Sequence, residues 1–277
     1  MSSRRLFSML ALVAAALVGC GNPQGSEPTG SKSSSISDGT SDFTHTNVGA
    51  VLRRDPTSGL WRLTCSGTLI APKVFLTAGH CMRAERMAVT FIQNIAPGNP
   101  IPADAPVFEG TAVRHPNYVA SGDGSRERFD YMVLLLDEAP GLPLATLPSA
   151  GVIDQLAKNG TLSLRSDMTA VGYGLAENNG MGGGSNYWAL SNERRRAQMD
   201  FNALTGKSMI KATRRLGGDG TVCFGDSGGP LFYTIDGVET LVGTATIGDA
   251  SCSTLYLASR TDLAQARDFL APYVTLP

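Results

Sequence analysis

A stretch near the carboxyl end, "TVCFGDSGGPLF" at residues 221–232, sets Asp226 and Ser227 before two glycines, between Cys223 and an apolar run. A serine hydroxyl is a weak nucleophile unless a neighbouring base takes its proton, and that base needs a further group to orient it. Nucleophilic chemistry at Ser227 therefore requires a histidine and a carboxylate from elsewhere in the chain.

The chain has three histidines, and only one has a setting that suits a base. His80 lies in "VFLTAGHC", at the end of an apolar run and directly before Cys81, where a disulfide could fix the backbone that presents the imidazole. His45 lies at the end of a polar leader, and His115 precedes a proline. We therefore predict that His80 is the base and assign no such part to the other two.

The orienting carboxylate should lie beside an apolar strand, because a low dielectric keeps its interaction with the imidazole strong. Asp130, in "RFDYMVLLLDEAP", directly precedes the apolar run from Tyr131 to Leu136. Asp137, at the other end of the same run, is the alternative. We predict that Asp130 orients His80.

The composition is that of a folded protein, because 42% of the 277 residues are hydrophobic. A formal net charge of -1 gives no electrostatic argument for nucleic-acid binding. The run Arg194-Arg195-Arg196 is too short to change this, and we interpret it as a solvated strand or loop.

The first residues are typical of an export signal. An arginine pair precedes an apolar run from Leu6 to Val18, which is too short to cross a bilayer of about 30 Å as a helix. The sequence "LVGC" at 17–20 resembles the lipobox of bacterial lipoproteins, so we expect removal of residues 1–19 and a lipid on Cys20. An ordinary secretory signal is the alternative, and a twin-arginine signal is a minor one.

Residues 21–37 are dominated by Gly, Ser, Pro and Thr, the composition of a flexible tether, which we place at 20–35. An exported chain meets conditions in which disulfides persist, and the four cysteines beyond Cys20 allow three pairings. No two of those four have the C-x₂₋₄-C spacing of a zinc site, so we expect no metal. The glycine stretch at 180–184 lacks a following Gly-Lys-Ser/Thr and is interpreted as a loop, so no cofactor is expected.

Short apolar runs recur between turn signals along the rest of the chain, and most have the length and the Val, Thr and aromatic content of strands. In "LFYTIDGVETLVGTATIG" two such runs flank Asp236-Gly237, a two-residue hairpin signal. Only Thr261 to Tyr273 has apolar residues at helical spacing. Many strands and one terminal helix predict an all-β barrel or sandwich.

Three motifs in this order, "LTAGHC", "DYMVLLLDEAP" and "GDSGGP", resemble the signature blocks of the chymotrypsin-like serine proteases, the trypsin family in its broad sense. The segments "CSGTLIAPKVFLTAGHC", "HPNY" at 115–118 and "VGYG" at 171–174 are similar to further parts of the family pattern. The resemblance runs from about Ile36 to the terminal helix. Three blocks in family order are far more specific than any one of them.

The resemblance implies two six-stranded antiparallel β-barrels packed face to face, followed by a C-terminal helix. We expect the protease domain at 36–277, with barrel one at about 36–145, barrel two at about 146–260 and the helix at about 261–274. It also implies two disulfides, each bracing a catalytic loop: Cys65 with Cys81, and Cys223 with Cys252.

The residue roles implied by the resemblance are those of the family's template. Ser227 attacks the peptide carbonyl, His80 takes its proton and later gives it to the leaving amine, and Asp130 holds the imidazole. The backbone N–H groups of Gly225 and Ser227 converge on the oxyanion. The active site is then the crevice between the barrels.

Asp226 occupies the place of the family's activation acid. Family members are usually made as zymogens, and cleavage frees an Ile or Val ammonium that buries itself against this acid. Ile36, in "ISDGTSDFTHTNVGAVL", is the candidate, although the residue before it and the two after it depart from the family pattern. Cleavage there would also separate the domain from Cys20, so we expect activation and release from the membrane to be one event.

The expected specificity follows from three positions around the implied pocket. Thr221 sits where trypsin carries the aspartate at the base of its pocket, so cleavage after Lys or Arg is not expected. Gly248 matches a pocket-wall glycine, and Thr254 replaces the second one. A side chain at position 254 narrows the specificity pocket, as in elastases, and favours small or medium uncharged substrate residues. Thr246 to Gly248 should pair with the substrate backbone as an added strand.

These motifs predict a monomeric serine endopeptidase of the cell envelope, released to the extracellular space after cleavage near Ile36. Its expected partners are protein or peptide substrates and an activating protease, with no nucleic acid and with the membrane only through Cys20. The alternative from another class is an inactive lipoprotein that uses the double barrel as an adhesin or binding module. An esterase is disfavoured, because in the Gly-x-Ser-x-Gly hydrolases the acid and the base follow the serine.

Overall fold

The computed structural model of the chain describes most residues from Gly39 onward, and the backbone of Ser34–Ser35. The described ranges are 39–95, 101–119, 129–177, 188–190, 193–206, 208–215, 220–248, 252 and 254–277. The predicted features that lie outside them are the export signal at 1–19, the lipid site at Cys20, most of the tether at 20–35, the new amino terminus at Ile36 and the glycine loop at 180–184. No helix within the described ranges is long and apolar enough to cross a membrane.

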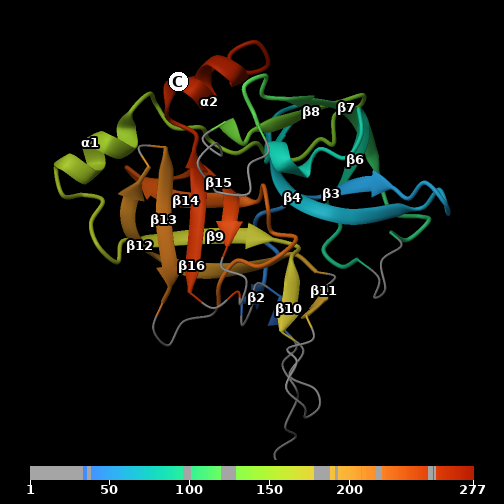
Figure 1. The fold of residues 1–277 in the computed structure, drawn as a ribbon, viewed down its shortest axis with the longest axis horizontal. Coiled ribbons are helices and arrows are strands. Elements are labelled where there is room, and N and C mark those ends of the chain that lie inside the picture. Colours follow the sequence, from blue (N-terminus) through green and yellow to red (C-terminus); the bar gives the residue numbers. More distant parts are fainter. Residues whose placement is uncertain are drawn as a thin grey trace, which may run out of the picture. The chain divides into compact units, whose positions relative to one another are not determined.

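Strands β3 to β8 form a closed antiparallel barrel, barrel one, drawn in blue to green in Figure 1. Their hydrogen-bonded order is β3-β4-β5-β8-β7-β6, and β6 pairs back with β3 to close the ring. The bounds are β3 (Val48–Arg54), β4 (Trp61–Ala71), β5 (Val74–Thr77), β6 (Arg86–Thr90), β7 (Phe108–Arg114) and β8 (Met132–Leu136).

Strands β9 and β12 to β16 form barrel two, drawn in yellow to red in Figure 1. Their order is β13-β16-β15-β14-β9-β12, and β12 pairs with β13 to close this ring as well. The bounds are β9 (Asp167–Gly172), β12 (Arg195–Thr205), β13 (Met209–Arg214), β14 (Pro230–Ile235), β15 (Val238–Gly248) and β16 (Leu255–Arg260). Two six-stranded antiparallel barrels confirm the predicted fold class.

The remaining strands are short. Strand β2 (Thr40–Ser41) pairs with the first two residues of β12. A separate three-stranded sheet has the order β1-β10-β11. Its strands are β1 (Ser34–Ser35), β10 (Leu175–Glu177) and β11 (Trp188–Leu190).

The uninterrupted apolar runs of β5 and β8 are explained by burial on both faces. Phe75 of β5 packs inside barrel one, whereas Val74 and Leu76, which point the other way, pack in the cluster between the barrels. In β8 the same alternation sends Met132 inward and Val133 to the interface. Because successive side chains of a strand alternate between faces, a strand buried on both sides reads as continuous hydrophobic sequence.

The cluster between the barrels also receives the end of the chain. Helix α2 (Ala264–Leu270) follows the last strand of barrel two, and its Phe269 and Leu270 pack with Val48 and Val171, one residue from each barrel. The helix lies within the predicted 261–274 but is shorter. A helix of this length is stable because of such packing and not by itself.

The hairpin prediction is confirmed, whereas the prediction of a single helix is wrong. Asp236 and Gly237 connect β14 to β15, and both have the positive φ values, 50° and 80°, that such a tight turn requires. Helix α1 (Val152–Lys158) was not predicted. The carboxylate of Asp262 accepts the N–H of Ile153 and so satisfies one donor at the first turn of this helix.

Candidate active site

The register of barrel one brings His80 and Asp130 together. Strand β5 runs antiparallel to β8, with Thr77 opposite Met132. The residues that follow β5 therefore lie beside those that precede β8. His80 sits in the 3₁₀ turn Gly79–Cys81 directly after β5, and Asp130 lies two residues before β8.

Asp130 holds the backbone and the ring of His80 at once. Its Oδ1 accepts the backbone N–H of His80 at 2.7 Å, and its Oδ2 lies 2.7 Å from Nδ1 of the ring. Asp130 is fully buried, whereas the side chain of His80 is 30% exposed. A carboxylate oxygen accepts hydrogen bonds, so Nδ1 is the ring nitrogen that donates here, and Nε2 has no partner among the described residues. The alternative acid, Asp137, is exposed and pairs with Arg86.

Ser227 lies in the loop before β14, and its backbone is held against barrel one. Its carbonyl oxygen accepts the N–H of Ser66 at 2.9 Å and lies 3.7 Å from Sγ of Cys81, the residue after His80. The approach is close, since a Cβ on Gly228 would stand 2.0 Å from the hydroxyl of Thr77. Among the described residues no hydrogen bond joins Oγ of Ser227 to His80, so that contact stays a prediction.

The two predicted oxyanion donors are unoccupied within the part of the chain that the structure describes. Neither the N–H of Gly225 nor that of Ser227 donates a hydrogen bond there. Gly225 has φ +96°, a conformation that favours glycine, and a Cβ at this position would lie 2.9 Å from Cα of Gly174. Within the described residues, the loop thus leaves the N–H groups on both sides of Asp226 without an acceptor.

Asp226 is buried and has no cationic partner among the described residues. Its carboxylate accepts the N–H of Gly174 at 2.8 Å and the N–H of Cys223 at 2.9 Å. Burial raises the pKa of this carboxyl to about 7, although the two backbone hydrogen bonds act in the opposite direction. A buried carboxylate in this state would be stabilised by an incoming cation.

Both disulfides implied by the family resemblance are present. Cys65–Cys81 links β4 to the turn of His80, and Cys223–Cys252 links the loop of Ser227 to the segment after β15. Each bond lies within one barrel. The one group of potential metal ligands in the described ranges is Cys65, His80 and Cys81, and the disulfide occupies both of its sulfurs. That donor set does not suit a cation, because a metal ligand would have to be a free thiolate.

The predicted pocket residues lie on barrel two, near the loop of Ser227. Thr221 is fully buried, and its hydroxyl has no partner among the described residues. Gly248, at the end of β15, would place a Cβ 3.6 Å from the carbonyl of Val222, so this end of the strand lies beside the start of the loop. Thr254 is exposed, and the hydroxyl of Thr246 is bonded to Ser259 at 2.7 Å.

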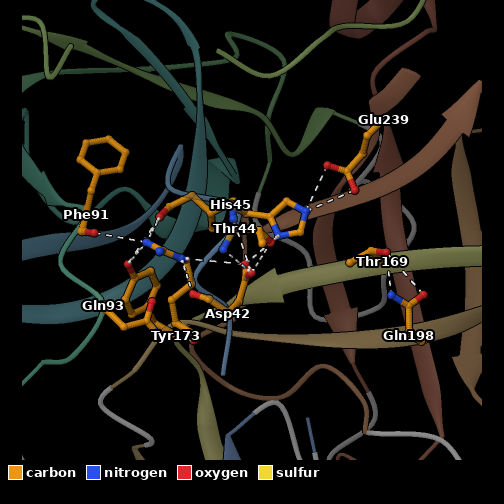
Figure 2. A network of polar contacts seen from close by, with 11 residues as sticks. Asp42, Thr44, His45, Phe91, Gln93, Thr169, Tyr173, Gln198 and Glu239 are labelled. Carbon is orange, nitrogen blue, oxygen red and sulfur yellow. Dashed lines mark hydrogen bonds and ion pairs between the residues drawn. The ribbon is translucent and has the colours of Figure 1, made fainter. Parts of the chain in front are cut away.

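A buried polar network that sequence reasoning missed holds the segment before β3, as Figure 2 shows. His45 places Nδ1 2.7 Å from Asp42 and Nε2 3.1 Å from Glu239 of β15. The polar leader seen in the sequence therefore ends before His45. Arg194 is also buried, and it donates to the backbone carbonyls of Asp42, Val48 and Phe91 and to Tyr173.

This network corrects the interpretation of the arginine run. Arg194 and Arg195 are buried, with 3% and 8% of their surface exposed, and only Arg196 faces solvent. A guanidinium can be buried where several carbonyl oxygens receive its fixed fork of donors. The third histidine, His115, is buried against Phe129 and Phe269, and burial lowers its pKa.

The charge state of this network follows from its contacts. Burial by itself lowers the pKa of His45, but hydrogen bonds to Asp42 and Glu239 outweigh it and raise the pKa to about 9. Burial likewise acts to raise the pKa of Asp42, but the hydrogen bond from His45 brings it below its ordinary value. At neutral pH both members of the pair are therefore charged.

Comparisons with known proteins agree with this geometry. The family model described as trypsin matches residues 39–270. The chymotrypsin-like elastase family member 1 of Canis lupus familiaris is 30% identical over 217 residues, which cover 70% of this chain and 74% of the relative. The proteins of the same description from Felis catus and Rattus norvegicus are 27% and 28% identical, each match covering 77% of this chain and 85% of the relative.

Proposed function

Because this chain belongs to the trypsin family of serine proteases, we propose that it is an active endopeptidase whose catalytic triad is His80, Asp130 and Ser227. Oγ of Ser227 attacks the peptide carbonyl while Nε2 of His80 takes its proton, and His80 then protonates the leaving amine. Water repeats the sequence on the acyl-enzyme and releases Ser227. Asp130 keeps the proton on Nδ1 and stabilises the imidazolium that forms.

The observation that carries this proposal is the double contact between Asp130 and His80. A buried carboxylate that bonds both the N–H and the ring of one histidine fixes its orientation and tautomer, which is what a general base requires. The backbone of Ser227 lies at the residue after that histidine. Hydrogen bonds between nucleophile and base are often long before substrate binds, so their absence does not argue against the pairing.

The charge that develops on the substrate would be stabilised by the N–H groups of Gly225 and Ser227. Both lack an acceptor within the described ranges, and the left-handed backbone of Gly225 is one that few other residues adopt. Removal of one such donor costs on the order of 10²–10³ in rate.

Activation would use the carboxylate of Asp226, which has no cationic partner among the described residues. We propose that cleavage before Ile36 frees an ammonium group that pairs with it. The raised pKa of Asp226 supports a site that lacks its cation. The assignment of Ile36 itself rests on sequence alone, and so do the lipid on Cys20, the tether at 20–35 and the release of the domain by the same cleavage.

The preferred substrates would carry small or medium uncharged residues before the scissile bond. Thr221 brings no charge to the base of the pocket, Gly248 leaves one wall open, and Thr254 narrows the other. The relatives named above are elastases by description, which supports this preference. Residues Thr246 to Gly248 would pair with the substrate backbone.

Labelling with a fluorophosphonate probe tests the proposal, with amino-terminal sequencing of the labelled band. We expect labelling of the wild type, none of Ser227→Ala, and a sequence that begins at residue 36. Casein and peptide p-nitroanilides with Ala, Val, Arg or Phe before the bond would test hydrolysis, with Ala or Val preferred. A folded wild type that is neither labelled nor active would instead favour the binding-module alternative, and a preference for Arg would contradict the pocket assignment.

A further inference from the structure

We propose that Ser66, on β4 of barrel one, is a positioning residue that holds the oxyanion-binding loop of barrel two in place. The inference rests on the catalytic function proposed above. Ser66 is fully buried and makes no hydrogen bond with a side chain of the triad. Its contacts go to the backbone of the loop on either side of Asp226.

The first contact fixes the peptide group that follows Ser227. The carbonyl of this group accepts the N–H of Ser66 at 2.9 Å, and its N–H, from Gly228, donates to the carbonyl of Ala245 at 2.7 Å. The group is therefore held at both ends, by barrel one on one side and by β15 on the other.

The second contact fixes the peptide group that follows Gly225. The carbonyl of Gly225 accepts the hydroxyl of Ser66 at 3.0 Å, and the N–H of the same group, from Asp226, donates to the carbonyl of Cys223 at 3.1 Å. Ser66 thus binds one carbonyl on each side of Asp226 and so clamps the tripeptide that contains the nucleophile.

The direction of the Ser66 hydroxyl is determined by a third contact. Its oxygen accepts the N–H of Tyr173 at 2.9 Å, so its single proton remains for the carbonyl of Gly225. The next residue, Gly174, donates to the carboxylate of Asp226. One hydroxyl therefore connects the strand end after β9 to the loop of the nucleophile.

Ser66 is in turn tied to the strand that leads to the proposed base. Its carbonyl accepts the hydroxyl of Thr77 at 2.7 Å, and Thr77 ends β5, three residues before His80. The base and the oxyanion donors come from different barrels. Ser66 is hydrogen-bonded both to the strand that leads to the base and to the loop that carries the oxyanion donors, and so it fixes the spacing between them.

The functional consequence follows from the freedom of glycine. The N–H of Gly225 lies in the peptide plane before this residue, and the carbonyl that Ser66 holds lies in the plane after it. The two planes are related by rotation about φ and ψ of Gly225, which glycine limits least of all residues. Because this N–H has no partner of its own in the described structure, the hydrogen bond of Ser66 to the next peptide plane contributes to its restraint. Loss of that grip would loosen the donor without removing it.

The test compares Ser66→Ala with the wild type in the processed protein, with an alanine p-nitroanilide peptide and rates per active site titrated with fluorophosphonate. We expect kcat about tenfold lower, the equivalent of one neutral hydrogen bond, and KM within about twofold. Affinity for a peptidyl boronic acid, whose tetrahedral adduct uses the oxyanion donors, should fall with kcat. A merely structural role would lower the unfolding temperature but leave this affinity unchanged.

Ser208→Ala is the matched control, because Ser208 is also buried and donates its hydroxyl to a glycine carbonyl, but on the hairpin before β13. It should keep the wild-type kcat. The isosteric pair Ser66→Thr and Ser66→Val serves if Ser66→Ala gives little folded protein: the threonine variant should be about tenfold faster per titrated site. The inference is overturned if Ser66→Ala has the kcat of the wild type, or if Ser66→Val has the kcat of Ser66→Thr. An inactive, unlabelled wild type would instead defeat the proposed function.

Discussion

The described part of the chain contains two pairs in which a buried aspartate contacts a partly buried histidine, Asp42 with His45 and Asp130 with His80, and their local geometries are alike. In both, a carboxylate oxygen lies 2.7 Å from Nδ1 of the ring, and the other oxygen accepts the backbone N–H of the same histidine. The pairs differ at the second ring nitrogen. Nε2 of His45 lies 3.1 Å from Glu239, whereas Nε2 of His80 has no partner in the described structure.

This difference separates a histidine whose two ring nitrogens both contact carboxylates from the proposed base, whose Nε2 has no partner among the described residues. With carboxylates on both nitrogens and its ring stacked on Phe232, His45 has a pKa raised to about 9 and keeps both protons at neutral pH. It cannot accept a third. The ring of His80 is held equally firmly on one side and is open on the other. A buried aspartate therefore orients a histidine in either case, and the far nitrogen decides what the histidine does.

Asp130→Asn should have the largest effect of these changes and should separate the two aspartate–histidine pairs most clearly. The amide keeps the shape but removes the acceptor that holds the proton on Nδ1, so we expect kcat to fall about 10⁴-fold. The equivalent change in the other pair, Asp42→Asn, should leave the rate per titrated active site within about twofold of the wild type. Active-site titration followed by peptide hydrolysis measures both, and a large loss in both variants would contradict the distinction.

Asp226 supplies a third buried aspartate, one with no histidine. Its pKa in the folded chain is about 7, above the ordinary value of 3.8, so the folded state binds more protons than the unfolded state between these values. The uncleaved chain should therefore lose stability as the pH rises from 4 to 7, by on the order of 4 kcal/mol. Urea unfolding of Ser227→Ala at several pH values measures this.

Two comparisons identify the source of that loss. Asp226→Asn should remove the pH dependence of the uncleaved chain. Protein cut before Ile36 should show much less of it, because the new ammonium pairs with the ionised carboxylate. If the cut and uncut forms lose stability equally between pH 4 and 7, the pairing does not form.

His45→Gln should lower the free energy of unfolding by about 3 kcal/mol at pH 6, because it leaves the carboxylate of Asp42 buried without its cation. The raised pKa of His45 gives the sign of the pH dependence. Its contribution is fully present below the unfolded value of 6.5 and is lost as the pH rises through about 9. The gap between wild type and variant in denaturant unfolding should therefore close above pH 9, while the rate per titrated site at pH 7 is retained.

Glu239→Gln should have the smallest effect. The side chain of Glu239 is 45% exposed, so loss of its ion pair should cost no more than about 1 kcal/mol. The change should still lower the pKa of His45, which ring-proton NMR titration can follow. The control is Glu109→Gln, which removes another half-exposed carboxylate, one that pairs with Arg54 and not with His45. It should leave the titration curve of His45 unchanged.

The barrels and the contact between the proposed base and its acid could be predicted from sequence because their signals are local. The hairpin at Asp236-Gly237 and the alternating faces of β5 and β8 are each contained in fewer than about ten residues. The contact between His80 and Asp130 spans 50 residues, but each lies at the end of a strand, and the two strands pair. Resemblance to a known family supplied the rest of the arrangement.

What could not be predicted depends on contacts between distant segments. His45 looked like part of the leader because Glu239, its second partner, is 194 residues away. Arg194 looked solvated because most of its acceptors are backbone carbonyls, which leave no trace in sequence. Ser66 was missed for the same reason: its hydroxyl bonds peptide groups and not side chains. Such roles are readable only from coordinates.

A grip on main-chain carbonyls does not depend on the side chains that those residues carry. Phe224, directly before Gly225, is 56% exposed, and none of the contacts made by Ser66 involves its ring. Substitution at such a neighbour should therefore leave the hydrogen bonds of Ser66 in place. Within this scaffold, exposed side chains of the loop can vary in evolution while the backbone contacts that hold the loop are kept.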